Sequence, residues 1–146
     1  MKRVSEIRRA GASGPVVDRV VLDADDRQRR RIVLTSDEGT KLLLDFPSPV
    51  TLHDGDALVL DDGSLIAVAG RAEPLIEVSA KTPLDLVRLA WHIGNRHTDI
   101  QFVAQAFRIR HDHVLEEMVR GLGGVIKAIE ASFDPEPAAP HSHPHA

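Results

Sequence analysis

The sequence predicts an α+β protein: a small all-β N-terminal domain, then a ferredoxin-like βαββαβ C-terminal domain, then a disordered tail that contains histidine. Short segments rich in Val, Ile and Leu, separated by turn residues, fill the first half of the chain. Two segments with a helical spacing of apolar residues follow, among further strand-like segments. We expect the three parts to span residues 1–72, 73–134 and 135–146.

The first domain is predicted from five apolar segments that are bounded by Gly, Pro and Asp residues. The pair Asp62-Gly63 is a strong hairpin signal, because a type I′ turn needs residues that accept a positive φ. Short strands joined by such turns are typical of an all-β domain. The expected strands are 16–22, 30–35, 41–46, 56–60 and 64–70.

The second domain begins with a strand expected at 75–80 and a helix that starts at Pro83. Thr82 is suited to cap this helix, and proline is favoured at the first helical position, where an N–H has no partner. Gly94 is expected to end the helix in a left-handed cap. A wide apolar stripe at helical spacing runs along it, made of Leu84, Leu86, Val87, Leu89, Ala90, Trp91 and Ile93.

The rest of the second domain supplies the other elements of the ferredoxin-like order. Residues 99–110 can form one or two strands, 111–124 show helical spacing, and 125–133 form a last strand. Asp112 is placed to cap the second helix. The order β, α, β, β, α, β is that of a sheet covered by helices on one face. From Asp134 the chain has four prolines and no large apolar residue, which is typical of a disordered segment.

Composition narrows the class of protein. The chain has 146 residues, of which 42% are hydrophobic and 27% charged, so it can bury a real core. No stretch approaches the ~18 consecutive apolar residues of a membrane helix, and the first residues lack the apolar run of a signal peptide. We therefore expect a cytoplasmic protein without a membrane partner. The absence of cysteine excludes thiolate metal sites and leaves imidazole and carboxylate as the strong metal ligands.

The charge balance argues against a general nucleic-acid binder. Such proteins usually carry a basic face, whereas this chain has a net charge of −4. One basic run exists at residues 27–31, but Asp23, Asp25 and Asp26 precede it and offset its field. We expect that run to be a solvated strand edge or turn.

Histidines are concentrated toward the C-terminus. Seven of the eight lie in the last 55 residues, where an even spread would place about three. Three of them alternate with other residues in the tail, so one segment offers several imidazoles to an ion such as Ni²⁺, Cu²⁺ or Zn²⁺. Metal capture explains this pattern better than an incidental polar tail. The three are His141, His143 and His145.

The other histidines are less informative by themselves. His111 and His113 flank the capping residue Asp112 and would, alone, be interpreted as two surface histidines. His92 lies on the first helix, where we expect a packing or supporting role. A lone histidine that follows a helix, as His97 does, is more often structural than a metal ligand.

Two segments around these histidines form a specific pattern. WHIGNRHTDIQ (91–101) reads aromatic, His, aliphatic, Gly, Asn, Arg, His and then Thr, Asp and Ile before Gln, and RHDHVLEEMVRGLG (110–123) follows it. Together these segments resemble the UreE family of nickel chaperones. Further segments resemble that family in the same order, so the resemblance covers nearly the whole chain; they are 34–47, 54–68, 72–78 and 133–138.

The resemblance implies a nickel-binding metallochaperone rather than an enzyme. In the family the histidine that closes GNRH comes from both subunits of a homodimer and binds one Ni(II) ion across the two-fold axis. The two histidines of the HDH segment line a peripheral site, and C-terminal histidines supply further ligands. Zn(II) or Cu(II) can occupy such ligands in vitro. The residues implied are His97 for the shared site, His111 and His113 for the peripheral site, and His141, His143 and His145 in the tail.

The resemblance also implies partners. The recipient of the metal would be the urease maturation complex, including the urease accessory GTPase (UreG), and the destination would be the dinickel site of urease. The N-terminal β domain has no evident chemistry and would dock a partner. Ligands limited to imidazole and water would permit stepwise transfer of the ion, because no closed cage holds it.

Two alternatives are compatible with the residues. One is a general nickel or zinc buffer without a particular recipient, since the ligand type does not choose between these ions. The other is a metal-dependent hydrolase that uses His111, Asp112 and His113, with Glu116 or Glu117 as the base. No HExxH, GxSxG or P-loop motif accompanies those residues, so catalysis is the weaker hypothesis.

Overall fold

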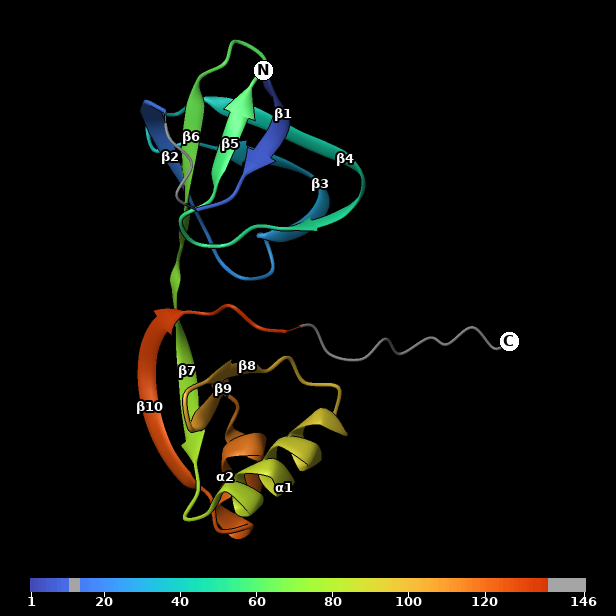
Figure 1. The fold of residues 1–146 in the computed structure, drawn as a ribbon, viewed down its shortest axis with the longest axis vertical. Coiled ribbons are helices and arrows are strands. Elements are labelled where there is room, and N and C mark those ends of the chain that lie inside the picture. Colours follow the sequence, from blue (N-terminus) through green and yellow to red (C-terminus); the bar gives the residue numbers. More distant parts are fainter. Residues whose placement is uncertain (11–13, 137–146) are drawn as a thin grey trace, which may run out of the picture. The chain divides into compact units, whose positions relative to one another are not determined.

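The computed structural model describes residues 1–10 and 14–136, and the chain divides between Arg71 and Ala72 into two compact units (Figure 1). Each unit has its own sheet and its own hydrophobic core. None of the helices in the described part is long and apolar enough to cross a membrane. From residue 137 on, the tail expected from the sequence lies outside the described residues.

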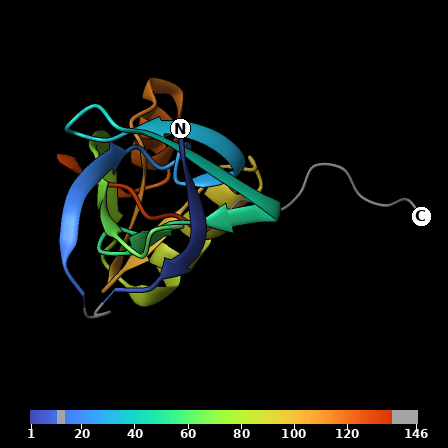
Figure 2. The same cartoon turned by 90° about the horizontal axis from the view of Figure 1, so that it is seen from above.

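The N-terminal unit contains β1 (Lys2–Arg8), β2 (Val16–Leu22), β3 (Gln28–Thr35), β4 (Lys41–Thr51), β5 (Ala57–Leu60) and β6 (Leu65–Gly70). These strands form one sheet in the order β2-β6-β5-β1-β4-β3. Seen from above, the sheet curves round its inner face (Figure 2). Alternate side chains, among them the fully buried Val20, Leu42 and Leu58, fill that face and form the core.

The first strand, β1, is not among the strands expected from the apolar segments. Its sequence KRVSEIR is mostly charged, so it lacks the β-branched and aromatic enrichment on which strand prediction depends. Val4 is its buried residue, and Ile7 packs against the core. The strand lies inside the sheet, parallel to β4 and antiparallel to β5, so pairing with its neighbours fixes its conformation.

Strand β4 is longer than expected, because it continues through Pro47 and Pro49 to Thr51. The ladder with β3 shifts there: Arg29 pairs with Val50, whereas Arg31 pairs with Asp45. The prolines therefore lie where the ladder is interrupted and no N–H group is needed for pairing. A turn was the natural expectation for Pro-Ser-Pro, and the structure replaces it by a bulge.

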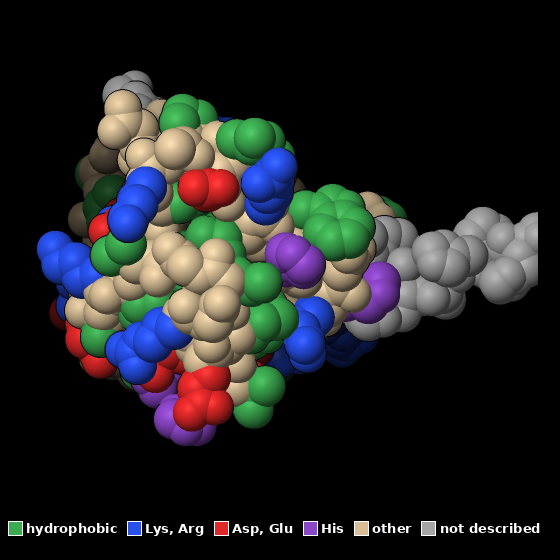
Figure 3. Space-filling model, turned by 90° about the horizontal axis from the view of Figure 1, so that it is seen from below, with side chains coloured by type: hydrophobic (Ala, Val, Ile, Leu, Met, Phe, Trp, Pro, Cys, Tyr) green, Lys and Arg blue, Asp and Glu red, His purple; other side chains and the backbone are tan. Residues whose placement is uncertain are grey.

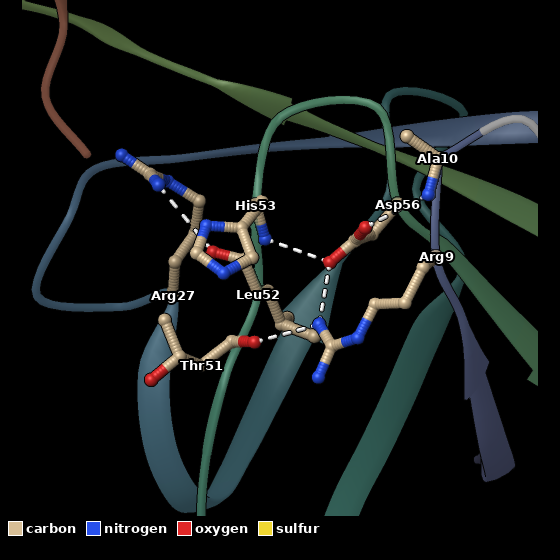
Figure 4. Close-up of polar contacts among 7 residues, drawn as sticks. All are labelled: Arg9, Ala10, Arg27, Thr51, Leu52, His53 and Asp56. Atoms are coloured by element: carbon tan, nitrogen blue, oxygen red, sulfur yellow. Dashed lines mark hydrogen bonds and ion pairs between the residues drawn. The ribbon is translucent and has the colours of Figure 1, made fainter.

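A buried carboxylate joins the end of β1 to the turn before β5 (Figure 4). Asp56 is 2% exposed and accepts hydrogen bonds from the backbone N–H groups of His53 at 2.8 Å and Ala10 at 3.1 Å. The Nη1 atom of Arg9 lies 2.7 Å from the same carboxylate. Because one side chain satisfies donors from two segments, it holds those segments together.

Arg27 corrects the expectation that the whole basic run at 27–31 is solvated. Its side chain is 2% exposed, and its guanidinium donates to the carbonyl oxygen of Leu22 at 3.3 Å. It also donates to the carbonyl oxygen of Leu52 at 3.4 Å (Figure 4). The rest of the run lies exposed on β3, at the edge of the sheet, as expected. A buried arginine and its exposed neighbours look alike in sequence, so only the fold separates them.

The C-terminal unit contains β7 (Ala72–Ser79), α1 (Pro83–Gly94), β8 (Gln101–Val103), β9 (Ala106–Arg110), α2 (His113–Gly121) and β10 (Val125–Ser132). The strands form an antiparallel sheet in the order β10-β7-β9-β8, with both helices on one face (Figure 1). Because β9 lies between β7 and β8, this is the split βαβ arrangement of a ferredoxin-like domain. The α+β fold class, with an all-β unit before this one, is confirmed.

Both helix starts follow the sequence prediction. The hydroxyl of Thr82 accepts a hydrogen bond from Asp85 N at 3.1 Å, and the carboxylate of Asp112 accepts one from Leu115 N at 3.0 Å. The end of α1 differs from the prediction of a left-handed Gly94. That glycine is the last helical residue, and helix-like turns continue beyond it until His97, whose φ is 56°.

The apolar stripe of α1 divides into a buried and an exposed part. Leu89 and Ile93 are buried against the sheet. Leu84, Val87 and Trp91, however, are exposed by 57%, 63% and 63%. These three residues form what we call the α1 apolar strip. The space-filling view from below shows hydrophobic side chains with histidines next to them (Figure 3). The helix therefore carries more apolar surface than its own unit covers.

Candidate metal centre

His97 is presented on a tight turn at the end of α1. Its backbone N–H donates to the carbonyl of Gly94 at 3.0 Å, and its φ of 56° lies in the left-handed region. A non-glycine residue in that region costs about 1–2 kcal/mol, so the surrounding contacts must hold it there. One such contact joins the turn to α2, where Arg96 Nε lies 3.1 Å from Met118 Sδ. The result is an exposed imidazole on a constrained backbone.

A hollow of about 370 Å³ brings His97 and His111 together. It lies in the C-terminal unit, between the turn after α1 and the start of α2. Because the β8–β9 hairpin returns the chain to the start of β7, where His111 N donates to the carbonyl of Pro74 at 3.1 Å, the two histidine segments become neighbours. The hollow is lined by His97, Thr98, Asp99, Arg110, His111, Asp112 and Leu115.

Arg110 is the charged centre of this hollow. Its Nη1 lies 3.1 Å from Asp99 Oδ2 and its Nε lies 3.7 Å from Glu73 Oε1. Its guanidinium also stacks over the buried ring of Phe133, 4.9 Å from the centroid. The positive charge is therefore balanced by two carboxylates, and Asp99 is held in an ion pair. The sequence patterns did not indicate Arg110 or Asp99 as residues of this site, because the β8–β9 hairpin must fold before their ion pair can form.

His113 does not line the hollow. It is the first residue of α2, where its Nε2 lies 3.3 Å from Glu117 Oε1 and its Nδ1 lies 3.9 Å from Glu116 Oε2. His111 precedes the capping residue Asp112 and lines the hollow, whereas His113 follows Asp112 and lies on the first turn of α2. His111 thus lines the hollow with His97, whereas His113 lies beside Glu116 and Glu117 of α2, and the peripheral site expected at these two histidines stays a prediction.

In residues 1–10 and 14–136, no three His, Asp or Glu side chains are arranged as a group that could hold a metal ion. His141, His143 and His145, which are candidate ligands, lie outside the described residues. The last described residue, Glu136, lies beside the strand-like segment that follows His97, because its N–H donates to the carbonyl of Ile100 at 2.7 Å.

Comparison with known proteins identifies the family. A sequence model of the UreE urease accessory protein C-terminal domain matches residues 73–146, and a model of the N-terminal domain of the same protein matches residues 2–70. The chain belongs to the UreE family. The resemblance seen in the histidine segments is therefore confirmed over both units. This is a family of urease accessory proteins and not of enzymes, which sets aside the hydrolase hypothesis.

Relatives named urease accessory protein UreE cover most of this chain. The protein of Rhodopseudomonas palustris strain HaA2 is 56% identical over 125 residues, which are 86% of this chain and 58% of the relative. That of Rhizobium rhizogenes strain K84 is 38% identical over 144 residues, 98% of this chain and 86% of the relative. The chain spans 66% of a second Rhodopseudomonas palustris relative, from strain BisB18, so some UreE proteins are considerably longer.

Proposed function

We propose that this UreE protein is a homodimeric Ni(II) metallochaperone that delivers the ion to the urease maturation complex for assembly of the dinickel site. One observation carries the proposal: His97 is exposed on a constrained turn at the end of the helix that bears the exposed α1 apolar strip. An uncovered apolar strip beside a single candidate ligand is what a protein needs if a second copy completes its metal site.

The strip supports dimerisation through the C-terminal unit. Leu84, Val87 and Trp91 follow the i, i+3, i+7 spacing of one helix face and are each more than half exposed. A two-fold axis beside this face pairs the strip with itself, because an isologous interface uses the same surface on both subunits. The same axis would bring the two copies of His97 near each other, since that residue lies on the turn just beyond the helix end at Gly94.

Two imidazoles from two subunits make a carrier site rather than a storage cage. Ni(II) accepts imidazole nitrogen readily, and the coordination positions that remain are open to water, to tail histidines or to a recipient's ligands. Exchange of those ligands one at a time lets the ion leave. His111 shares the hollow with His97 and would assist this transfer, while His113 with Glu117 would be a weaker peripheral site. The tail ligands are His141, His143 and His145.

The partners follow from the family. We propose that the recipient is the urease maturation complex, with the urease accessory GTPase (UreG) as the direct acceptor, in the cytoplasm. Nothing in the N-terminal unit provides a comparable histidine pair, so its role would be to dock a partner. Zn(II) and Cu(II) would occupy the same ligands in vitro, because imidazole does not discriminate strongly among these ions.

Delivery is tested by activation of urease. The Ni(II)-loaded protein would be added to nickel-free urease and its accessory proteins, with a chelator present that removes free nickel but not protein-bound nickel. We expect urease activity to appear with the parent protein and not with His97→Ala loaded to the same nickel content. Equal activation by the parent and by a nickel–histidine complex would instead indicate a general metal buffer.

A further inference from the structure

The outer face of the N-terminal sheet carries a group of basic side chains on three adjacent strands. Side chains two residues apart on a strand share a face, and Leu42 and Leu44 of β4 are buried in the core. Lys41, Leu43 and Asp45 therefore lie on the opposite, outer face of β4. This places the face outside the core and available to solvent.

Two arginines join that face through the strand pairing. Arg31 of β3 lies directly opposite Asp45, and Arg3 of β1 lies beside Leu43. Their guanidinium nitrogens lie 3.7 Å and 3.8 Å from Asp45 Oδ2, and both side chains are about three-fifths exposed, at 60% and 58%. Each cation is therefore near the carboxylate while most of it faces water.

A bulge adds a third arginine. Successive residues on a regular strand point to opposite faces, so Arg30 should point away from Arg31. The register between β3 and β4 shifts at this residue, however, and Arg30 Nη1 reaches to 3.9 Å from Asp45 Oδ1 and 3.4 Å from the carbonyl of Phe46. Bulges commonly redirect a side chain in this way. Three guanidinium groups thus share one carboxylate.

The charges of this face do not balance. Arg3, Arg30, Arg31 and Lys41 contribute four positive charges and Asp45 contributes one negative charge, whereas the chain as a whole has a net charge of −4. Asp61 and Asp62 line a hollow with Arg3 at one border of this group, and Asp62 pairs with Lys2. Charged residues on an edge strand discourage unwanted strand pairing. That role does not account for Arg3 and Lys41, because β1 and β4 are interior strands.

We infer that this basic face, defined as Arg3, Arg30, Arg31, Lys41 and Asp45 with the exposed Val33 among them, binds an acidic segment of a partner protein. Planar guanidinium groups match carboxylates in paired hydrogen bonds, and Val33, half exposed and opposite Leu43, adds an apolar contact. A long polyanion such as nucleic acid fits less well, since it would extend from this small face over an acidic protein. The inference does not depend on metal binding.

The test measures binding of a fluorescently labelled poly-glutamate peptide by anisotropy at low ionic strength. Arg30→Glu combined with Arg31→Glu should weaken binding by about tenfold or more, because attraction becomes repulsion at two positions. Arg8→Glu combined with Arg71→Glu is the matched control: it changes the net charge of the same unit equally, and both residues are exposed. The control should retain the parent's affinity within about twofold.

Asp45→Asn gives a change in the opposite direction, which loss of folding cannot imitate. Removing the carboxylate that the three arginines share should tighten peptide binding several-fold, and added salt should reduce the gain. Thermal melting of each variant checks the fold. The inference is overturned if the parent does not bind the peptide, if both double variants weaken binding equally, or if Asp45→Asn brings no gain. Tighter binding of a short DNA duplex than of the peptide would show that the occupant is not a protein.

Discussion

His97 and His111 line one hollow of the C-terminal unit, although the whole β8–β9 hairpin separates them along the chain. One imidazole comes from the turn that ends α1 and the other precedes the cap of α2. The residue of the proposed shared site, His97, and His111, which is proposed to assist transfer, are therefore neighbours within a subunit. If both residues bind metal as proposed, this proximity would give an ion a short route between them, and single substitutions would separate their contributions.

Replacing His97 with Ala should abolish the tightest nickel site. The expected change in the free energy of unfolding is small, near the ~0.5 kcal/mol typical of surface substitutions, because the side chain is exposed. Titration calorimetry measures the affinity, and chemical denaturation measures the stability. His111→Ala is the matched control and should keep the first ion. If His111→Ala loses that ion while His97→Ala binds it as tightly as the parent, the shared site has been assigned to the wrong residue.

Replacing Val87 with Asp should convert the dimer to a monomer. The substitution puts a charge into the centre of the α1 apolar strip, where a second copy would have to bury it without a partner. Light scattering with excess chelator present measures the mass without any contribution from metal. Val114→Asp is the control, since Val114 is 65% exposed on α2 and lies outside the strip. A parent protein that is already monomeric, with and without nickel, would remove the basis for a shared site.

Deleting residues 140–146 should lower the number of ions bound and leave the dimer intact. A proline-rich terminal segment is expected to contribute little to a core, whereas its three histidines are proposed metal ligands. Calorimetric titration of the deletion variant against the parent measures the stoichiometry. Replacing the three tail histidines with serine in the full-length chain should have the same effect. Unchanged stoichiometry in both variants would mean that the tail binds no metal.

Replacing Asp56 with Ala should destabilise the N-terminal unit by about 2 kcal/mol, because two backbone N–H groups and Arg9 lose a buried acceptor. Urea denaturation measures the loss. Asp61→Ala, which removes an exposed carboxylate from the same unit, should change stability by less than ~0.5 kcal/mol. Equal effects of both substitutions would show that the contacts of Asp56 contribute little.

Local sequence signals predicted the elements that depend on local chemistry. Thr82 and Asp112 cap helices because their side-chain oxygens accept from N–H groups three residues later, a relation that sequence contains. Apolar segments likewise predicted five of the six strands in the first unit. Strand β1 was not predicted, because its conformation depends on pairing with β4 and β5, which are distant in the sequence.

The candidate site shows the same division. The histidine segments indicated His97 and His111, but their shared hollow and the ion pair of Asp99 with Arg110 arise from the β8–β9 hairpin. The exposure of Trp91 could not be predicted either, because the spacing of apolar residues on a helix does not say which of them other elements cover. The turn after α1 also shows what the sequence could not predict. A glycine permits a left-handed helix cap, so Gly94 was the expected position, yet His97 adopts that conformation instead.

Native mass spectrometry tests the shared nickel site most directly. The metal-free protein would be mixed with Ni(II) at half an equivalent per chain, so that each dimer can take one ion. The predicted species contains two chains and one Ni(II), and it should be lost when the chains carry His97→Ala although the dimer itself persists. A dominant species of one chain with one Ni(II), or a His97→Ala dimer that still retains its single ion, would contradict the account.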